Sequence, residues 1–306
     1  MPTPSSISPI RTGRTSTRRN WFARWALSKS ASAGSVAGSS AIGSQRRRRT
    51  VTVLCLLPAA VGAIYLSPPF SALIFAAAGA LGVYEWAGLA RWDSVAQRWA
   101  FTAAYAVLAA AAYAVAELQA AALWLGVVIW IFAIGAIFTW PSCRRLLERR
   151  WLAAVLGVLV VWGAWSGAVA IRAEPNGSHW LLWVFALIWG ADIGAYLTGM
   201  RFGQRRLAPT LSPGKTWEGV LGGAALGGGA CIGALAVTGV IGWVWVAITL
   251  VLLAGSIFGD LMESLLKRTY GVKDSGSLLP GHGGVLDRID SALPVLPAFA
   301  VILGSV

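Results

Sequence analysis

The chain has 306 residues, of which 57% are hydrophobic and only 12% are charged, and its formal net charge is +13. A soluble globular protein carries about a quarter charged residues, so this composition excludes an ordinary soluble domain. Together with repeated apolar runs it predicts a polytopic membrane protein. In such a chain, membrane orientation and anionic lipid or phosphate ligands explain the positive charge better than nucleic acid, and no nucleic-acid partner is expected.

The first 50 residues are a basic tail, rich in Ser and Arg, without acidic residues or apolar periodicity. This composition predicts disorder and is also similar to that of an organelle transit peptide; both interpretations stay open. We expect residues 1–50 to be separate from a transmembrane domain at 51–306, whose motif-bearing part is 180–306.

Nine apolar segments follow the tail, each about long enough to cross a ~30 Å hydrocarbon core at a 1.5 Å rise per residue. They lie at 51–66, 69–90, 100–117, 120–140, 151–171, 180–199, 217–239, 241–259 and 292–306. With a cytoplasmic N-terminus, nine spans place every Lys and Arg except Arg172 on the cytoplasmic side, as the positive-inside rule requires. The predicted fold is therefore an all-α helical membrane bundle of about nine transmembrane helices.

The seventh segment is rich in glycine at small-xxx-small spacings, which let helix backbones approach closely. We expect these glycines to serve packing rather than ligand binding. They are Gly222, Gly223, Gly227, Gly228, Gly229 and Gly233.

Asp192 and Glu85 are acidic residues within or at the end of apolar segments. Asp192 is inside the sixth segment, where a carboxylate is costly unless it is paired, metal-bound or open to a polar cavity. Tyr196, one turn later, shares its helix face. We expect a functional role for Asp192, whereas Glu85, at the cytoplasmic end of the second segment, is equally compatible with a functional and a structural role.

The loop at 211–219 precedes the seventh segment and offers Ser212, Lys215 and Thr216. Free N–H groups at a helix N-terminus, with a lysine beside them, can bind phosphate. Gly214-Lys215-Thr216 is superficially similar to a nucleotide-binding P-loop, but that motif needs glycine where the chain has Pro209, so we reject it.

The stretch from Ser264 to Asp290 mixes cations, carboxylates and glycines. If the eighth helix continues, Asp260, Ser264 and Lys267 share one face, and Asp287 and Asp290 can share another. Such carboxylate pairs could ligate Mg²⁺ while bound phosphates complete its coordination.

An alternative is that these acids only pair with Lys267, Arg268 and Arg288 in a solvated loop. His282, flanked by glycines, is compatible with phosphate contact or with a general acid–base role.

This stretch resembles the signature of the phosphatidate cytidylyltransferases, or CDP-diacylglycerol synthases. The positions that match are Ser264, Lys267, Arg268, Lys273, Asp274, Gly276, Leu279, Pro280, His282, Gly283, Gly284, Asp287, Arg288 and Asp290. Asp192-x-x-Ala195-Tyr196 and the loop Ser212-Pro213-x-Lys215-Thr216-x-Glu218-Gly219 are similar to family motifs in the same order. The resemblance covers about residues 50–306.

The resemblance implies an integral-membrane enzyme that transfers CMP from CTP to phosphatidate, giving CDP-diacylglycerol and pyrophosphate. It implies Mg²⁺, with room for a second cation, at a site facing the cytoplasm in a bacterial-type plasma membrane. The implied partners are CTP, phosphatidate and the lipid bilayer, and a homodimer is allowed.

Carried over residue by residue, the resemblance assigns three sets of site residues. The implied metal ligands are Asp260 and Asp287, supported by Asp192, Asp274 and Asp290. The implied catalytic residues are Asp260, Asp287, Lys267, Arg268 and His282. Substrate phosphates would be held by Ser212, Lys215, Thr216, Lys273 and Arg288, with Tyr196 beside them. Two departures stand out: Gly214 replaces a lysine that is common in the family, and Arg201 is one place late.

Two other functions stay open. A CTP-dependent lipid kinase would use a similar surface of cations and carboxylates. An ion-coupled transporter would explain Asp192 within a span, but transporters bind their substrates near the midplane, whereas the charges of this chain concentrate at one face.

Overall fold

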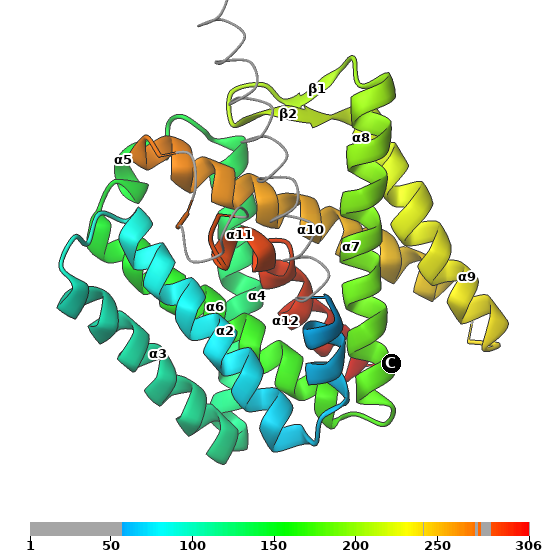
Figure 1. Cartoon of the computed structure of the whole chain (residues 1–306), viewed down its shortest axis with the longest axis horizontal. Coiled ribbons are helices and arrows are strands. Elements are labelled where there is room, and N and C mark those ends of the chain that lie inside the picture. Colours follow the sequence, from blue (N-terminus) through cyan, green and yellow to red (C-terminus); the bar gives the residue numbers. More distant parts are fainter. Residues whose placement is uncertain (1–56, 241, 273–274, 277–282, 306) are drawn as a thin grey trace, which may run out of the picture. The chain divides into compact units, whose positions relative to one another are not determined.

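The computed structural model describes residues 57–240, 242–272, 275–276 and 283–305, which are almost entirely helical (Figure 1). A first helical segment covers 57–65. The other helices are α2 (Pro68–Leu89), α3 (Val95–Ala114), α4 (Ala116–Phe138), α5 (Arg144–Leu147), α6 (Arg150–Ala173), α7 (Gly177–Phe202), α8 (Trp217–Gly223), the π-helical segment η1 (Ala224–Gly228), α9 (Gly229–Val237), α10 (Trp243–Tyr270), α11 (Leu286–Ile289) and α12 (Ala292–Leu303). The tail expected at 1–50 lies outside the described residues.

Six helices in this part of the chain are long and apolar enough to cross a membrane: α2, α4, α6, α7, the continuous helix α8–η1–α9, and α10. The prediction of an all-α polytopic membrane protein is therefore confirmed. The segments expected at 51–66, 100–117 and 292–306 correspond to helix 57–65, α3 and the 12-residue α12. The count of nine spans and the cytoplasmic N-terminus stay predictions.

Helix α6 is the centre of the bundle and packs against α2, α3, α4 and α12. Indole N–H groups tie these helices together: Trp86 donates to the carbonyl of Ala153 at 2.8 Å, and Trp165 donates to that of Ala72 at 2.9 Å. A hydrocarbon environment offers no water to these donors, so pairing them with backbone carbonyls of neighbouring helices removes a large desolvation cost.

Helix α7 lies against α8 and η1 at backbone distance, as the glycine spacing predicted (Figure 1). A Cβ placed on Gly190 would be 2.8 Å from Cα of Gly227, and one on Gly227 would be 2.5 Å from N of Ala191. Gly222 and Gly223 meet α7 in the same way. Gly229 and Gly233 have open space around them, so the packing prediction is wrong for those two positions.

The loop at 211–219 is not a simple turn opening a helix. It forms an antiparallel hairpin of β1 (Arg206–Ala208) and β2 (Ser212–Thr216), with Arg206 opposite Thr216. The Thr216 hydroxyl accepts the Gly219 N–H at 3.1 Å and so caps α8. An N-cap residue needs extended backbone, which here continues the strand up to the first residue of the helix.

Helix α10 continues past the expected end at 259 and ends at Tyr270, where Gly271 adopts a left-handed conformation with φ 69°. The polar residues of its last turns remain helical because they have partners from other segments. The Tyr270 hydroxyl donates to the carbonyl of Leu147 at 2.6 Å, and Arg91 donates to the carbonyl of Tyr270 at 2.9 Å.

We predict that Gly227→Ala destabilises the protein, because the new methyl group overlaps the backbone of α7 at Ala191. Overpacking of this kind costs about 1–3 kcal/mol. Thermal unfolding of the purified full-length protein in detergent measures it. Gly229→Ala is the matched control on the same helix and should be neutral or slightly stabilising, since Ala is the better helix former. Equal melting temperatures for the two variants would contradict the packing.

Candidate active site

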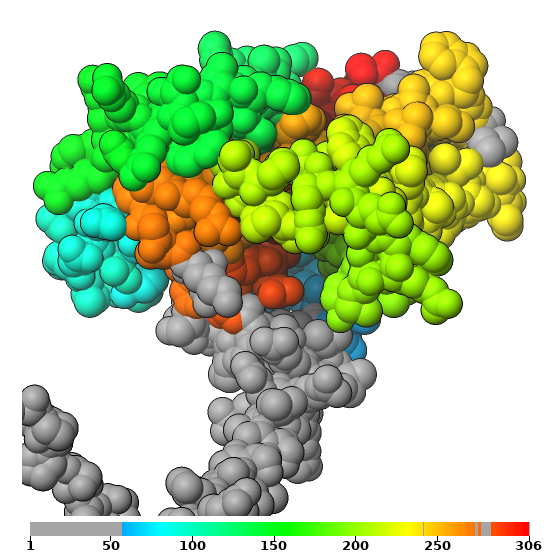
Figure 2. All heavy atoms as spheres, turned by 90° about the horizontal axis from the view of Figure 1, so that it is seen from above, coloured from blue at the N-terminus to red at the C-terminus, as the bar shows by residue number. Residues whose placement is uncertain are grey.

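The residues that the sequence singled out gather where three segments meet: the end of α10, the hairpin β1–β2, and the segment 283–291. Figure 2 looks at this face and shows the hairpin, the last turns of α10 and the α11 segment near one another. Hydrogen bonds join them: Lys215 of β2 reaches Asp260 of α10, and Lys267 of α10 reaches Asp287 of α11.

The first group, which we call the Asp260 cluster, consists of Asp260, Lys215, Asp290 and Ser291. The Asp260 carboxylate forms an ion pair with Lys215 and accepts the Ser291 hydroxyl at 3.2 Å. Asp290 shares a hydrogen bond with Asp260 and accepts the N–H of Ser291 at 2.7 Å. Each carboxyl group is thus held by at least two partners, which makes its position well defined.

The second group, the Asp287 cluster, consists of Glu263, Lys267 and Asp287. The Lys267 ammonium lies 2.8 Å from Glu263 and 2.5 Å from Asp287. Glu263 and Asp287 are themselves hydrogen-bond partners. Asp287 also accepts the N–H of Gly284 at 2.7 Å, so its side chain holds the start of α11.

The two clusters are about one helical turn apart, both along α10 and along the segment that carries Asp287 and Asp290. Asp260 and Glu263 are three residues apart on α10, and Asp287 and Asp290 are three residues apart across α11, so the acids form two cross-segment carboxyl pairs, Asp260–Asp290 and Glu263–Asp287. Sharing a proton within a pair reduces the cost of holding two carboxyl groups together.

The acids contributed by the 283–291 segment differ in protonation. Burial alone would raise the pKa of Asp287, but hydrogen bonds with Glu263 and Lys267 lower it to about 2. Burial, and then the negative charge of Asp260, raise the pKa of Asp290 well above its usual value of 3.8. Asp287 is therefore held as an anion that can bind a cation, whereas Asp290 retains its proton more readily than a free carboxyl group and shares a hydrogen bond with Asp260.

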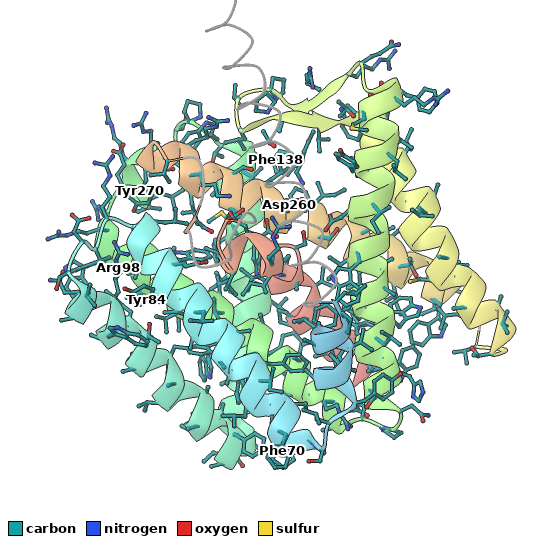
Figure 3. The ribbon with its side chains drawn as sticks, in the orientation of Figure 1. Phe70, Tyr84, Arg98, Phe138, Asp260 and Tyr270 are labelled. Carbon is teal, nitrogen blue, oxygen red and sulfur yellow. The ribbon has the colours of Figure 1, made fainter. Side chains whose placement is uncertain are left out.

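A cavity of about 380 Å³ opens beside the Asp260 cluster, between α7, β2, α8–η1 and α10. Its polar wall is formed by Asp192, Tyr196, Lys215 and Asp260, and the labelled Asp260 lies on α10 between α7 and the rest of the bundle (Figure 3). The remaining wall is apolar: Leu207, Val220, Ala224, Leu250, Leu253, Ala254 and Ile257. Asp192 is exposed and lines this cavity, within electrostatic range of Asp260 and Lys215.

Several predicted site residues do not belong to either cluster. Arg268 points to the hairpin, where it donates to the carbonyl of Leu211 at 3.2 Å. Thr216 lines the cavity, but its hydroxyl caps α8, and Ser212 is half-buried in β2. Arg288 is exposed on α11 and interacts electrostatically with Asp192. The predicted roles of Lys273, Asp274 and His282 lie outside the described residues.

Oxygen ligands for a hard cation are present at both clusters. In the described ranges no group of three or more His, Cys, Asp or Glu side chains is close enough to hold a metal ion by itself. Mg²⁺ does not need three protein side chains, since it is commonly held by one or two carboxylates together with water and substrate phosphates. The carboxyl pairs of the two clusters fit that mode of binding.

Two residues of this region carry no role in the sequence-based prediction, and the role of a third was left open there. Glu263 and Ser291 complete the two clusters; the i, i+4 spacing of Glu263 and Lys267 was a signal for the first of them. Glu85, on α2, is the third. Glu85 is 3% exposed, and its carboxylate accepts the N–H of Leu286 at 2.8 Å and also that of Val285.

The Glu85 carboxylate fits into a space that only glycine leaves open. A Cβ on Gly276 or on Gly284 would collide with it, and its Oε1 atom has no hydrogen-bond partner among the residues that are described. Glu85, which lies on a helix far away in the sequence, therefore fixes the backbone that carries Asp287. The structural role that the sequence left open is the one that these contacts support.

We predict that Glu85→Ala lowers the free energy of unfolding by about 1–3 kcal/mol, because two buried N–H groups lose their acceptor. Glu85→Gln retains an acceptor oxygen and should lose less. Hydrogen exchange measured by mass spectrometry locates the effect: amides at Val285 and Leu286 should exchange faster in Glu85→Ala. The control is Glu117→Ala, at an exposed position. Unchanged protection of Val285 and Leu286 would show that Glu85 does not hold this segment.

Known proteins with similar sequences include several phosphatidate cytidylyltransferases. A model of the cytidylyltransferase family matches residues 47–306. A phosphatidate cytidylyltransferase of Pseudomonas aeruginosa is 42% identical over 264 residues, which cover 84% of this chain and 96% of that protein. The Haemophilus influenzae protein of the same name is 33% identical over 83% of this chain and 97% of its own length. That of Brucella suis biovar 1 is 40% identical over 60% of this chain and 65% of its own length.

The family match spans the whole described part of the chain, including both clusters and the cavity. The chain belongs to the cytidylyltransferase family.

Proposed function

We propose that the chain is a phosphatidate cytidylyltransferase, which transfers CMP from CTP to phosphatidate and releases pyrophosphate. The names of its relatives support the reaction. One structural observation carries the proposal: the Lys215–Asp260 pair stands at the polar wall of a cavity whose other wall is apolar, and the Lys267–Asp287 pair lies further along the same helix, α10. A substrate with a phosphate head and hydrocarbon chains matches both parts of that cavity.

In this reaction an oxygen of the phosphatidate phosphate forms a bond to the α-phosphorus of CTP. The bond from that phosphorus to the oxygen bridging to the β-phosphate breaks, and both electrons leave with pyrophosphate. A phosphate monoester is already an adequate nucleophile, so no strong base is needed. The main barrier is repulsion between two anions, which fixed positive groups reduce. Lys215 and Lys267 are placed to do so.

Both lysines are paired with carboxylates. We infer that substrate phosphates take over these ammonium groups. Each carboxylate that loses its lysine would then be available to a divalent cation that the phosphates bring with them. The phosphate contacts would be completed by Arg288 on α11, Ser212 on β2 and Tyr196 on α7. The adjoining part of the family signature contributes His282, Lys273 and Asp274.

Mg²⁺ is the cation that this proposal includes. Asp260 and Asp287 would hold it, with Asp192 and Asp290 in support, and a second cation could share the same carboxylates. Bound there, a divalent cation would neutralise phosphate charge and orient the triphosphate. The carboxyl groups, in turn, would be kept in place by Ser291, Gly284 and Glu263.

The cavity and the charges also support a location for the reaction. We propose that the headgroup of phosphatidate enters from the bilayer between α7 and α10 while its chains lie along the apolar wall. Arg144, Arg145, Arg149 and Arg150 belong to the same positively charged side of the chain as Lys267 and Arg268, so the site would face the cytoplasm in a plasma membrane.

The test is a product analysis with purified full-length protein, CTP, phosphatidate and Mg²⁺. We expect CDP-diacylglycerol and pyrophosphate in equal amounts. A CTP-dependent lipid kinase would instead release CDP when given a polyprenol, and a transporter would consume no CTP; either result would refute the proposal.

The same assay distinguishes the loss of a site residue from a general loss of positive charge. Lys267→Ala should lower kcat by about 10²–10³, the usual loss when one group that stabilises transition-state charge is removed. Arg145→Gln removes a positive charge from an exposed position on α5 and should leave the rate unchanged.

A further inference from the structure

A second cavity lies at the end of the bundle that is opposite the candidate active site. It has a volume of about 210 Å³ and is lined by the first turns of α2, the last turn of α3, the first turn of α4 and the last turns of α6. In Figure 3, Phe70 marks this end of α2 and Tyr84 marks the end next to Glu85. Ser71 of the cavity and Glu85 are separated by about 21 Å along that helix.

Arg172 is the charged residue that lines this cavity. It is the one basic residue that the distribution of charges along the sequence places opposite the others, and it lines the cavity with Ser71, Tyr113 and Gln119. Its Nη2 donates to the carbonyl of Leu66 at 3.0 Å, which fixes the guanidinium against the helix at 57–65.

The guanidinium is not fully satisfied by these contacts. Its Nε–H is buried and has no acceptor in the described part of the chain, and a buried donor without an acceptor is costly. Glu117 and Glu174 are exposed at the same end, yet neither forms an ion pair with Arg172 in the ranges described. The position of Arg172 in the last turn of α6 favours a cation, but it does not supply the missing acceptor.

The size and surroundings of the cavity restrict its ligand. Its volume is below the roughly 300–1,000 Å³ of pockets that enclose a whole small molecule, so it suits a headgroup better than a nucleotide. Its floor is apolar, formed by Ala72, Phe75, Ala168 and Val169. Tyr113 is 48% exposed, and Val115 and Leu118 next to the cavity are 41% and 40% exposed. A ligand held here would therefore have hydrocarbon beside its anionic group.

We propose that this cavity binds the phosphate of an anionic phospholipid, with Arg172 as the charged partner and Gln119 and Tyr113 as further donors. A phosphate in the cavity would pair with the guanidinium that lines it, because arginine offers phosphate a planar set of donors. The site is separate from the proposed reaction and would occupy the leaflet opposite the active site.

The experiment is native mass spectrometry of the full-length protein titrated with dioleoyl-phosphatidylglycerol in detergent. Wild type should bind one phosphatidylglycerol more tightly than phosphatidylcholine, and Arg172→Gln should weaken that site by about tenfold. Arg145→Gln removes an equal charge from the opposite end and should retain it. Binding that is unchanged in Arg172→Gln, or reduced equally in both variants, would overturn the proposal.

Two further arms keep the result interpretable. If Arg172→Gln fails to fold, as judged by size-exclusion chromatography, Gln119→Leu takes its place and should also weaken phosphatidylglycerol binding. Inorganic phosphate is added as a competitor in the second arm. Retention of the lipid supports a phospholipid site, whereas displacement by inorganic phosphate would mean that the ligand is a soluble anion and would overturn the assignment to lipid.

Discussion

The arrangement of the C-terminal half depends on one physical constraint: charged side chains at the end of a membrane bundle must be paired. Lys215 and Lys267 each meet a carboxylate from another segment, and the carboxyl groups meet one another. Exposed ion pairs stabilise little, but these groups are partly or largely buried, and leaving one without its partner costs several kcal/mol. The two clusters therefore hold the hairpin and the segment 283–291 against α10.

The same pairing suits a site for anionic substrates. The ion pairs keep lysines and carboxylates in register, and under the proposed function a triphosphate with its cation would replace each partner by one of like charge. The protein does not have to bury a new charge without compensation. Glu85 and the two glycines around it keep the backbone of the 283–291 segment in place while those partners change.

Patterns within one helix were predicted well from the sequence. The spacing of Asp260 and Lys267 predicted one shared face if the helix continued, as α10 does, and the glycine spacing predicted a close helix contact, which the structure shows to be that of η1 with α7. The hairpin was missed because its residues are equally typical of a turn; only the capping by Thr216 shows why the chain is extended there. The role of Glu85 could not be derived, since it and Leu286 are 201 positions apart and no local pattern relates them.

The central claim is that the carboxylates of the two clusters hold the cation that accompanies the substrate phosphates. Mn²⁺ in place of Mg²⁺ tests it directly, with binding to the full-length protein in the presence of CTP followed by electron paramagnetic resonance. We expect Asp260→Asn and Asp287→Asn each to weaken Mn²⁺ binding by about tenfold or more, while Asp93→Asn, at an exposed position, leaves it unchanged. Wild-type affinity in both cluster variants would contradict the account.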